Sequence, residues 1–190
     1  ILVHEHIQRG RVRALHCIGN GIGSNADTVH DDGHDGTLDA IKILELVEFF
    51  HVLKFLGKIV KRYSVFYGNG NHEYRIKLYP DVYGKMGEEY AKGLSDIGIC
   101  PLCNESTRLE DENIVIYGLE IDREYYVRGK KNTMSVEYVQ EKLGVPDKSK
   151  FNILLAHNPE YFDAYAAWGA DLVISGHVHG GIMRLPLLGG

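Results

Sequence analysis

Two histidines near the end of the chain have a spacing that suits metal chemistry. Residues 171–175 read DLVIS, a short β-branched run that predicts a buried strand. Gly176 ends the run, and His177 and His179 follow it. In an extended backbone, side chains two residues apart project to the same side, so the two imidazoles can converge on one centre. Because neutral imidazole is the commonest transition-metal ligand, this pattern indicates a metal site; the alternative is a glycine-rich turn with two solvated histidines.

Two other apolar runs end in residues of the same kind. Residues 64–67 lead into GNGNHE, which contains Asn71 and His72, and residues 151–156 lead into His157. Open α/β sheets bind their ligands at strand ends, so we expect three strands to deliver these side chains to one edge of one sheet. The amide oxygen of Asn71 is a candidate neutral metal ligand, and His72 beside it can reach a substrate held at the metal. Glu73 is expected to orient a neighbour or to cap the following turn.

The motif order GNHE, then a lone histidine after a strand, then GHVH resembles that of the calcineurin-like metallophosphoesterases, over about residues 27–190. Asn69, Tyr74, Arg75 and the IMRLP segment at 182–186 are similar to the bacterial membrane-phosphoesterase-like branch of the family. The resemblance implies an α/β fold, a four-layer α/β/β/α sandwich of two mixed sheets. It also implies hydrolysis of a phosphate mono- or diester by a hydroxide that two divalent metal ions activate.

The resemblance implies a set of metal ligands. By the family pattern, one metal ion is bound by Asn71, His157 and His177, Asp27 bridges the two ions, and His179 belongs to the other ion. A mixed nitrogen and oxygen set suits Mn, Fe or Zn and does not choose among them.

Two further residues are candidates to act on the substrate. His72 would stabilise the phosphoryl oxygens or protonate the leaving alkoxide. Arg75 would bind the substrate phosphate bidentately, and the alternative is an ordinary surface arginine.

The N-terminal part departs from the family pattern, so residues 1–26 are treated as atypical. Family members carry an Asp-x-His motif after the first strand, where this chain has HEH at positions 4–6. Asp27 follows an alanine where the pattern has glycine, and it competes with the aspartates of the VHDDGHDG segment at 29–36, which also reads as a solvated acidic turn.

Two alternatives to the dinuclear phosphoesterase therefore stay open. The first is a degenerate or fragmentary family member that binds one metal ion or none and is inactive or an interaction domain. The second is a mononuclear zinc hydrolase on an unrelated fold, in which His157, His177 and His179 close one tetrahedral site.

Length and composition bound the other possibilities. The 190 residues, 44% of them hydrophobic, suit a single domain over 1–190, and because family domains continue into more strands we expect strands to be missing after Gly190. The net charge of −5 gives no basic footprint for nucleic acid, so the expected partner is a phosphate-ester substrate, with no specific protein partner.

No run approaches the roughly 18 apolar residues of a membrane span. We expect a cytoplasmic protein, membrane-associated if an anchor precedes Ile1, and the three cysteines fit a reducing compartment.

Hydrophobic periodicity and turn residues predict the elements that position these side chains. Helices are expected over residues 37–61, 81–97, 135–143 and 161–168, and strands over residues 64–67, 99–102, 107–109, 114–119, 151–156 and 171–175. The tyrosine-rich segment at 122–133 is either a substrate-facing lid or a loop whose tyrosines pack on the body, and the second interpretation is favoured.

Overall fold

The computed structural model of the chain describes residues 2–5, 50–109, 113–127 and 132–177. It confirms the α/β class, with two sheets in these residues. In the smaller sheet, β1 (Leu2–Glu5) pairs antiparallel with β2 (Tyr63–Phe66). The larger sheet is mixed: β3 (Glu105–Leu109) is antiparallel to β4 (Ile114–Leu119), which is parallel to β5 (Phe151–Ala156), and β5 is parallel to β6 (Leu172–Ile174).

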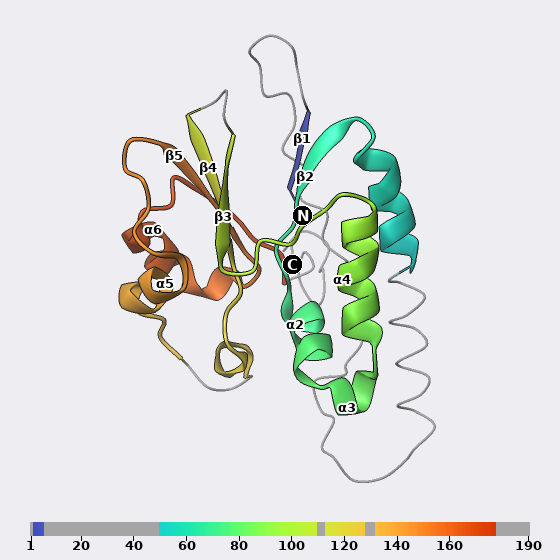
Figure 1. The fold of residues 1–190 in the computed structure, drawn as a ribbon. Coiled ribbons are helices and arrows are strands. Elements are labelled where there is room, and N and C mark those ends of the chain that lie inside the picture. The colour runs from blue at the N-terminus through green and yellow to red at the C-terminus, as the bar shows by residue number, and fades with distance from the viewer. Residues whose placement is uncertain (1, 6–49, 110–112, 128–131, 178–190) are drawn as a thin grey trace, which may run out of the picture.

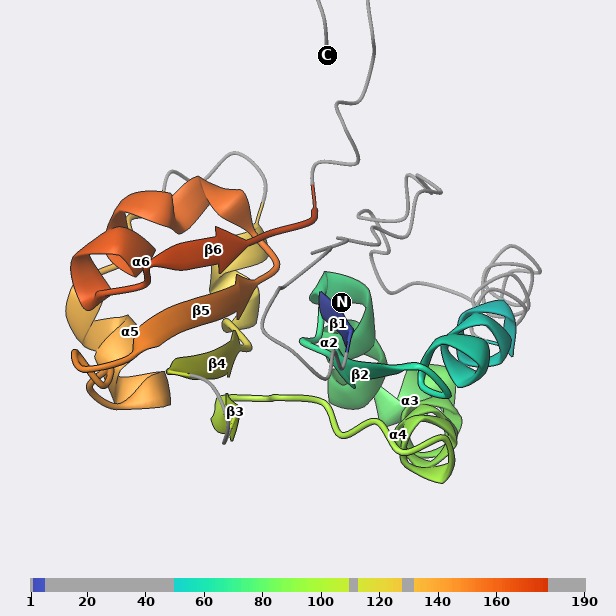
Figure 2. The same ribbon diagram turned by 90° about the horizontal axis from the view of Figure 1, so that it is seen from above.

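Helices flank the two sheets on opposite sides of the molecule (Figures 1 and 2). Helices α5 (Val136–Leu143) and α6 (Phe162–Trp168) cover one face of the four-stranded sheet. Helix α4 (Met86–Asp96) and the helical residues 50–59 lie beyond the two-stranded sheet. The order across the molecule is therefore helices, four-stranded sheet, two-stranded sheet and helices, as the four-layer expectation requires.

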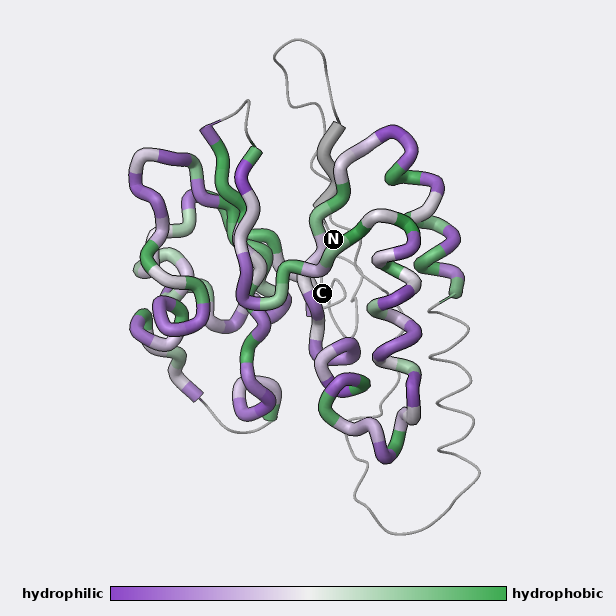
Figure 3. The backbone as a smooth tube through the Cα atoms, in the orientation of Figure 1, coloured by the Kyte–Doolittle hydropathy of each residue, from purple (hydrophilic) through white to green (hydrophobic). Residues whose placement is uncertain are grey.

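Strand β4 shows why the four-stranded sheet has a helical layer on one side and a second sheet on the other. Its alternate residues Val115, Tyr117 and Leu119 belong to the core cluster that includes Tyr165 and Trp168 of α6. Ile116 between them belongs to a different cluster, with Leu102, Ile153 and Leu155, against which Phe66 of β2 packs. Because strand side chains alternate between faces, β4 is buried on both, and Figure 3 shows the hydrophobic residues along it.

A third core cluster packs α4 and the helical residues 50–59 against the end of β2. It contains Leu56, Tyr67, Tyr90, Leu94 and Ile99. The hydroxyl groups of Tyr67 and Tyr90 are hydrogen-bonded to each other. The residue that follows β2 is thereby fixed to α4.

Several expected elements are confirmed. Strands β4 and β5 have the predicted bounds. Helix α5 begins after Ser135, whose Oγ accepts a hydrogen bond from the backbone N–H of Tyr138 at 3.2 Å, and it ends at Gly144, where φ is +75°. An N-cap serine and a glycine just past the last turn are the local signals on which this prediction depended.

Two expected elements differ from the structure. The helix predicted over 81–97 is broken into α3 (Pro80–Tyr83) and α4, because Gly84 between them adopts φ +56°. Residues 99–102 do not form a strand: a single bridge joins Pro101 to Tyr67, the residue after β2. A proline has no N–H to extend such a ladder.

For the helix predicted over 37–61, residues 50–59 are helical, and residues 37–49 lie outside the described residues. In the part of the chain that the structure describes, no helix has the length and apolar character needed to cross a bilayer.

Candidate active site

The GNHE segment forms the start of a helix rather than an open loop. Helix α2 (Asn71–Leu78) begins directly after Gly70, and the backbone N–H of Gly70 donates a hydrogen bond to Oε2 of Glu73 at 2.9 Å. A glutamate at the third helical position that accepts from the N-cap residue is half of a capping box. Glu73 therefore orients the segment, as expected, and fixes Asn71 and His72 in the first turn of α2.

His157, at the end of β5, meets this turn. Its Nε2 lies 3.0 Å from Oδ1 of Asn71. A Cβ atom at Gly70 would come within 2.9 Å of Cε1 of His157, and one at Gly176 would come within 3.2 Å of its Nδ1. The N–H of Gly176 also donates to the carbonyl of His157 at 3.0 Å. The glycines of the two motifs thus allow both backbones to approach the same imidazole ring.

His177 completes the described group. Its ring centroid lies 5.2 Å from that of His157, with an interplanar angle of 75°. The backbone of His177 has φ +64°, a left-handed conformation that is uncommon outside glycine. The extended-backbone argument that paired His177 with His179 was therefore wrong for His177. Residues held in such conformations gather at functional sites, where the surrounding structure compensates for the strain.

The predicted site residues are brought together in part. Asn71, His157 and His177 converge, and they do so from two sheets rather than from one edge of one sheet, because β2 pairs with β1 while β5 and β6 are neighbours. Asp27 and His179 lie outside the described residues.

His72 and Arg75 lie one turn apart on α2. Nη2 of Arg75 is 3.5 Å from Nδ1 of His72. The guanidinium group also lies over the ring of Tyr83, 5.8 Å from its centroid. Arg75 is half-buried and not a freely exposed surface arginine.

Tyr126 lies beside the histidines, a position that sequence reasoning did not assign to it. It ends the 3₁₀ helix η2 (Arg123–Tyr126), and its ring centroid is 5.6 Å from that of His177 and 6.5 Å from that of His157. The tyrosine-rich composition of residues 122–133 was the available signal. Both tyrosines of η2 are half-buried against the core, which agrees with the favoured interpretation of a segment packed on the body. Burial, followed by the charges of neighbouring groups, Glu73 among them, raises the pKa of the Tyr126 phenol well above its usual value.

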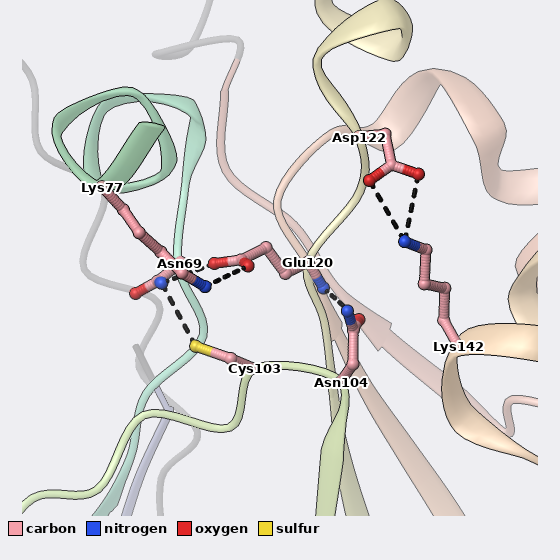
Figure 4. Close-up of polar contacts among 7 residues, drawn as sticks. All are labelled: Asn69, Lys77, Cys103, Asn104, Glu120, Asp122 and Lys142. Carbon is pink, nitrogen blue, oxygen red and sulfur yellow. Dashed lines mark hydrogen bonds and ion pairs between the residues drawn. The ribbon is translucent and has the colours of Figure 1, made fainter. Parts of the chain in front are cut away.

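A buried carboxylate fastens the GNHE segment to the four-stranded sheet. The side chain of Glu120, directly after β4, is 8% exposed. It accepts hydrogen bonds from Nδ2 of Asn69 at 2.7 Å and from Nζ of Lys77 at 2.9 Å (Figure 4). Its backbone N–H donates to Oδ1 of Asn104 at 2.9 Å. With these partners the buried charge is compensated, and Asn69 and α2 are fixed to the end of β4.

Cys103 takes part in the same network. Nδ2 of Asn69 lies 3.2 Å from its Sγ. Burial and the charge of Glu120 raise the pKa of the Cys103 thiol to about 11. A protonated, half-buried thiol packs as a small polar group, so Cys103 has a structural role in this network.

The side chains that the structure brings together can supply part of the ligand set of a metal ion. Asn71 offers an amide oxygen and the two histidines offer imidazole nitrogens, the mixed set that Mn, Fe and Zn accept. Among the described residues, no group of three or more His, Cys, Asp or Glu side chains is placed to hold a metal ion.

Comparison with known proteins gives one family match and one local relative. The model of the calcineurin-like phosphoesterases matches residues 26–181, which include every candidate site residue. Over 57 residues the chain is 37% identical to the uncharacterized protein YpbG of Bacillus subtilis (strain 168). That alignment covers 30% of this chain and 22% of YpbG. No solved structure gives a significant match.

Proposed function

Because the chain belongs to the calcineurin-like phosphoesterase family, we propose that it hydrolyses a phosphate mono- or diester with the help of divalent metal ions. The observation that supports this proposal is the convergence of Asn71, His157 and His177 from three separate strand ends. Nε2 of His157 lies 3.0 Å from the amide oxygen of Asn71, and the two imidazole rings are 5.2 Å apart.

The proposed ligand sets follow from this arrangement and from the family pattern. Asn71, His157 and His177 would hold one ion, Asp27 would bridge two ions, and His179 would bind the second. When bound, two divalent cations lower the pKa of a water molecule and polarise the phosphoryl oxygens for attack on phosphorus. The donor set suits Mn, Fe or Zn.

His72 is proposed to stabilise the oxygens of the reacting phosphoryl group. A guanidinium group can only donate hydrogen bonds, so the contact from Arg75 to Nδ1 at 3.5 Å favours the imidazole tautomer that carries its proton on Nε2. That N–H can donate a hydrogen bond to a phosphoryl oxygen or to the leaving oxygen as negative charge develops there. Arg75 would also attract the negative charge of the substrate phosphate.

The test is the metal dependence of hydrolysis in the wild type and in His72→Ala. We expect p-nitrophenyl phosphate or bis-p-nitrophenyl phosphate to be hydrolysed with Mn²⁺ and not with EDTA. In His72→Ala, kcat should fall by at least about a hundredfold, because losing one preorganised donor to the transition-state oxygens costs roughly 10²–10³-fold. Metal content should stay the same, since His72 is not among the proposed ligands.

The chain offers a matched control. His51 is exposed on the helical residues 50–59, so His51→Ala should retain wild-type hydrolysis. A folded wild type that carries one metal ion or none and hydrolyses neither ester would contradict the proposal and favour an inactive family member.

A further inference from the structure

We propose that Tyr126 is a substrate-contacting residue of this site, whose phenol hydroxyl donates a hydrogen bond to a phosphoryl oxygen of the ester. This inference rests on the proposed function and extends it to a residue outside the three motifs. It depends on where the ring lies, on what the hydroxyl contacts, and on how the segment is held.

The ring of Tyr126 lies against the two described histidines without stacking on either. It is tilted by 51° to His177 and by 56° to His157. His157 in turn contacts Asn71, with its Nε2 3.0 Å from Oδ1 of the asparagine. The ring of Tyr126 therefore lies beside the residues proposed to hold a metal ion.

The hydroxyl of Tyr126 differs from those of neighbouring tyrosines. Tyr138 donates to Asp122 at 2.9 Å, Tyr161 to the carbonyl of Tyr125 at 2.8 Å, and Tyr165 to the carbonyl of Asn158 at 2.9 Å. Within the part of the chain that the structure describes, the Tyr126 hydroxyl has no hydrogen bond to another residue. A half-buried phenol normally has a hydrogen-bond partner, which is water in the free protein and can be a ligand oxygen when substrate is bound.

The segment that carries Tyr126 is fixed at both ends. At its start, the carboxylate of Asp122 accepts from Tyr138 and forms an ion pair with Lys142 at 3.0 Å, which Figure 4 shows. Just before Tyr126, the carbonyl of Tyr125 accepts from Tyr161 and, at 3.3 Å, from Nδ2 of Asn158. Donors held in advance stabilise developing negative charge without reorganisation during the reaction.

The test compares Tyr126→Phe with Tyr125→Phe in the full chain loaded with Mn²⁺. The first change keeps the ring against both histidines and removes only the hydroxyl. The second removes a hydroxyl from the adjacent residue, whose ring packs on Tyr138 and Tyr161. Each variant is assayed for p-nitrophenyl phosphate hydrolysis, for the dissociation constant of inorganic phosphate by calorimetry, and for metal content.

We expect kcat/KM of Tyr126→Phe to fall by about tenfold to a hundredfold, the size of one lost hydrogen bond to a charged group. Phosphate should bind about tenfold more weakly, while metal content stays as in the wild type. Tyr125→Phe should match the wild type in every measurement. Unchanged hydrolysis and unchanged phosphate affinity in Tyr126→Phe, or equal losses in both variants, would overturn the inference.

The phosphate measurement separates this inference from the proposed function. If the wild type binds phosphate and hydrolyses neither ester, the proposed reaction is wrong, and the affinity of Tyr126→Phe still decides the role of the hydroxyl. A wild type that neither hydrolyses an ester nor binds phosphate would overturn both.

Discussion

Gly70 and Gly176 determine how closely two backbone segments approach the ring of His157. Gly70 has φ −96°, so its conformation is open to other residues, and space alone restricts the position. An added Cβ would lie 2.9 Å from the His157 ring and 3.0 Å from the carboxylate of Glu73. At Gly176 the nearest ring atom would be 3.2 Å away, a contact that a small shift can relieve.

The predicted result is that Gly70→Ala weakens Mn²⁺ binding by about tenfold to a hundredfold, the usual effect of displacing a group that orients a metal ligand. Gly176→Ala should have a smaller effect of the same sign. The matched control is Gly57→Ala, because a Cβ there would make an ordinary 3.7 Å contact with Ile97. The measurement is a calorimetric titration with Mn²⁺, which gives the dissociation constant of the ion. Wild-type affinity in Gly70→Ala would show that His157 does not need its present position to bind the ion.

The convergence of Asn71, His157 and His177 could be predicted from the sequence, and the positions of residues fixed by distant partners could not. The three residues follow apolar runs within a few positions, which is a local signal. Glu120 also follows an apolar run, but its importance comes from Asn69, 51 residues earlier in the chain. Tyr126 acquires its place from ring contacts with His157 and His177, 31 and 51 residues later. Such pairings depend on how the strands associate, which periodicity does not reveal.

At the scale of elements, η2 depends on hydrogen bonds from the helical layer of the four-stranded sheet. Tyr161, at the end of η3 (Pro159–Tyr161), is 6% exposed, and its hydroxyl donates to the Tyr125 carbonyl. In Tyr161→Phe this carbonyl keeps only the longer bond from Asn158 among its described partners.

We predict that Tyr161→Phe lowers the free energy of unfolding by about 1 kcal/mol, the typical contribution of one hydrogen bond. Because the ring remains, no cavity term adds to this loss. The measurement is urea unfolding of the full chain, with Tyr79→Phe as the control. The ring of Tyr79 contacts Arg123, and removal of its hydroxyl should change stability by less than about 0.5 kcal/mol. An equal loss in both variants would mean that the hydroxyl of Tyr161 does not hold η2.

Elements with strong local signals were predicted well, and those set by tertiary contacts were not. Helix α5 has a serine cap and a terminal glycine, and β4 and β5 are continuous apolar runs bounded by polar residues. The segment at 99–102 has similar composition, yet it crosses β4 at Gly118, where a Cβ would come within 2.1 Å of the Leu102 carbonyl. Whether an apolar run becomes a strand thus depends on the partner that it meets.

At the scale of the whole molecule, the candidate site lies at the junction of the two sheets. The sequence analysis predicted the strand ends correctly but placed all three in one sheet. Strand β2 instead pairs with β1, a pairing that the sequence pattern does not reveal. Besides the contact of Asn71 with His157, the N–H of Leu102 donates to the carbonyl of Tyr67 at 2.7 Å. Glu120 adds its bonds to Asn69 and Lys77 across the same boundary. An ion held by Asn71 together with His157 would therefore bind residues of both halves.

A ligand that binds across this junction should stabilise the whole chain and not one half alone. An ion at a concentration a hundredfold above its dissociation constant contributes about 2.7 kcal/mol to the free energy of unfolding. In a chain of 150–250 residues, this corresponds to an increase in Tm of roughly 5–11 °C. We predict such a rise with Mn²⁺ and its reversal by EDTA. In His157→Gln the rise should be lost, since the variant lacks a nitrogen ligand at the centre of the junction.

The measurement is a thermal melt followed by circular dichroism, with the exposed His51→Gln as the matched control that should keep the full rise. Ten histidines in the unfolded chain also bind Mn²⁺ weakly, which reduces the increase in every variant by a similar amount and leaves the comparison valid. A single transition that moves as a whole would indicate that both halves unfold together. A rise that persists in His157→Gln would place the bound ion away from the junction and would remove the geometric support for the proposed ligand set.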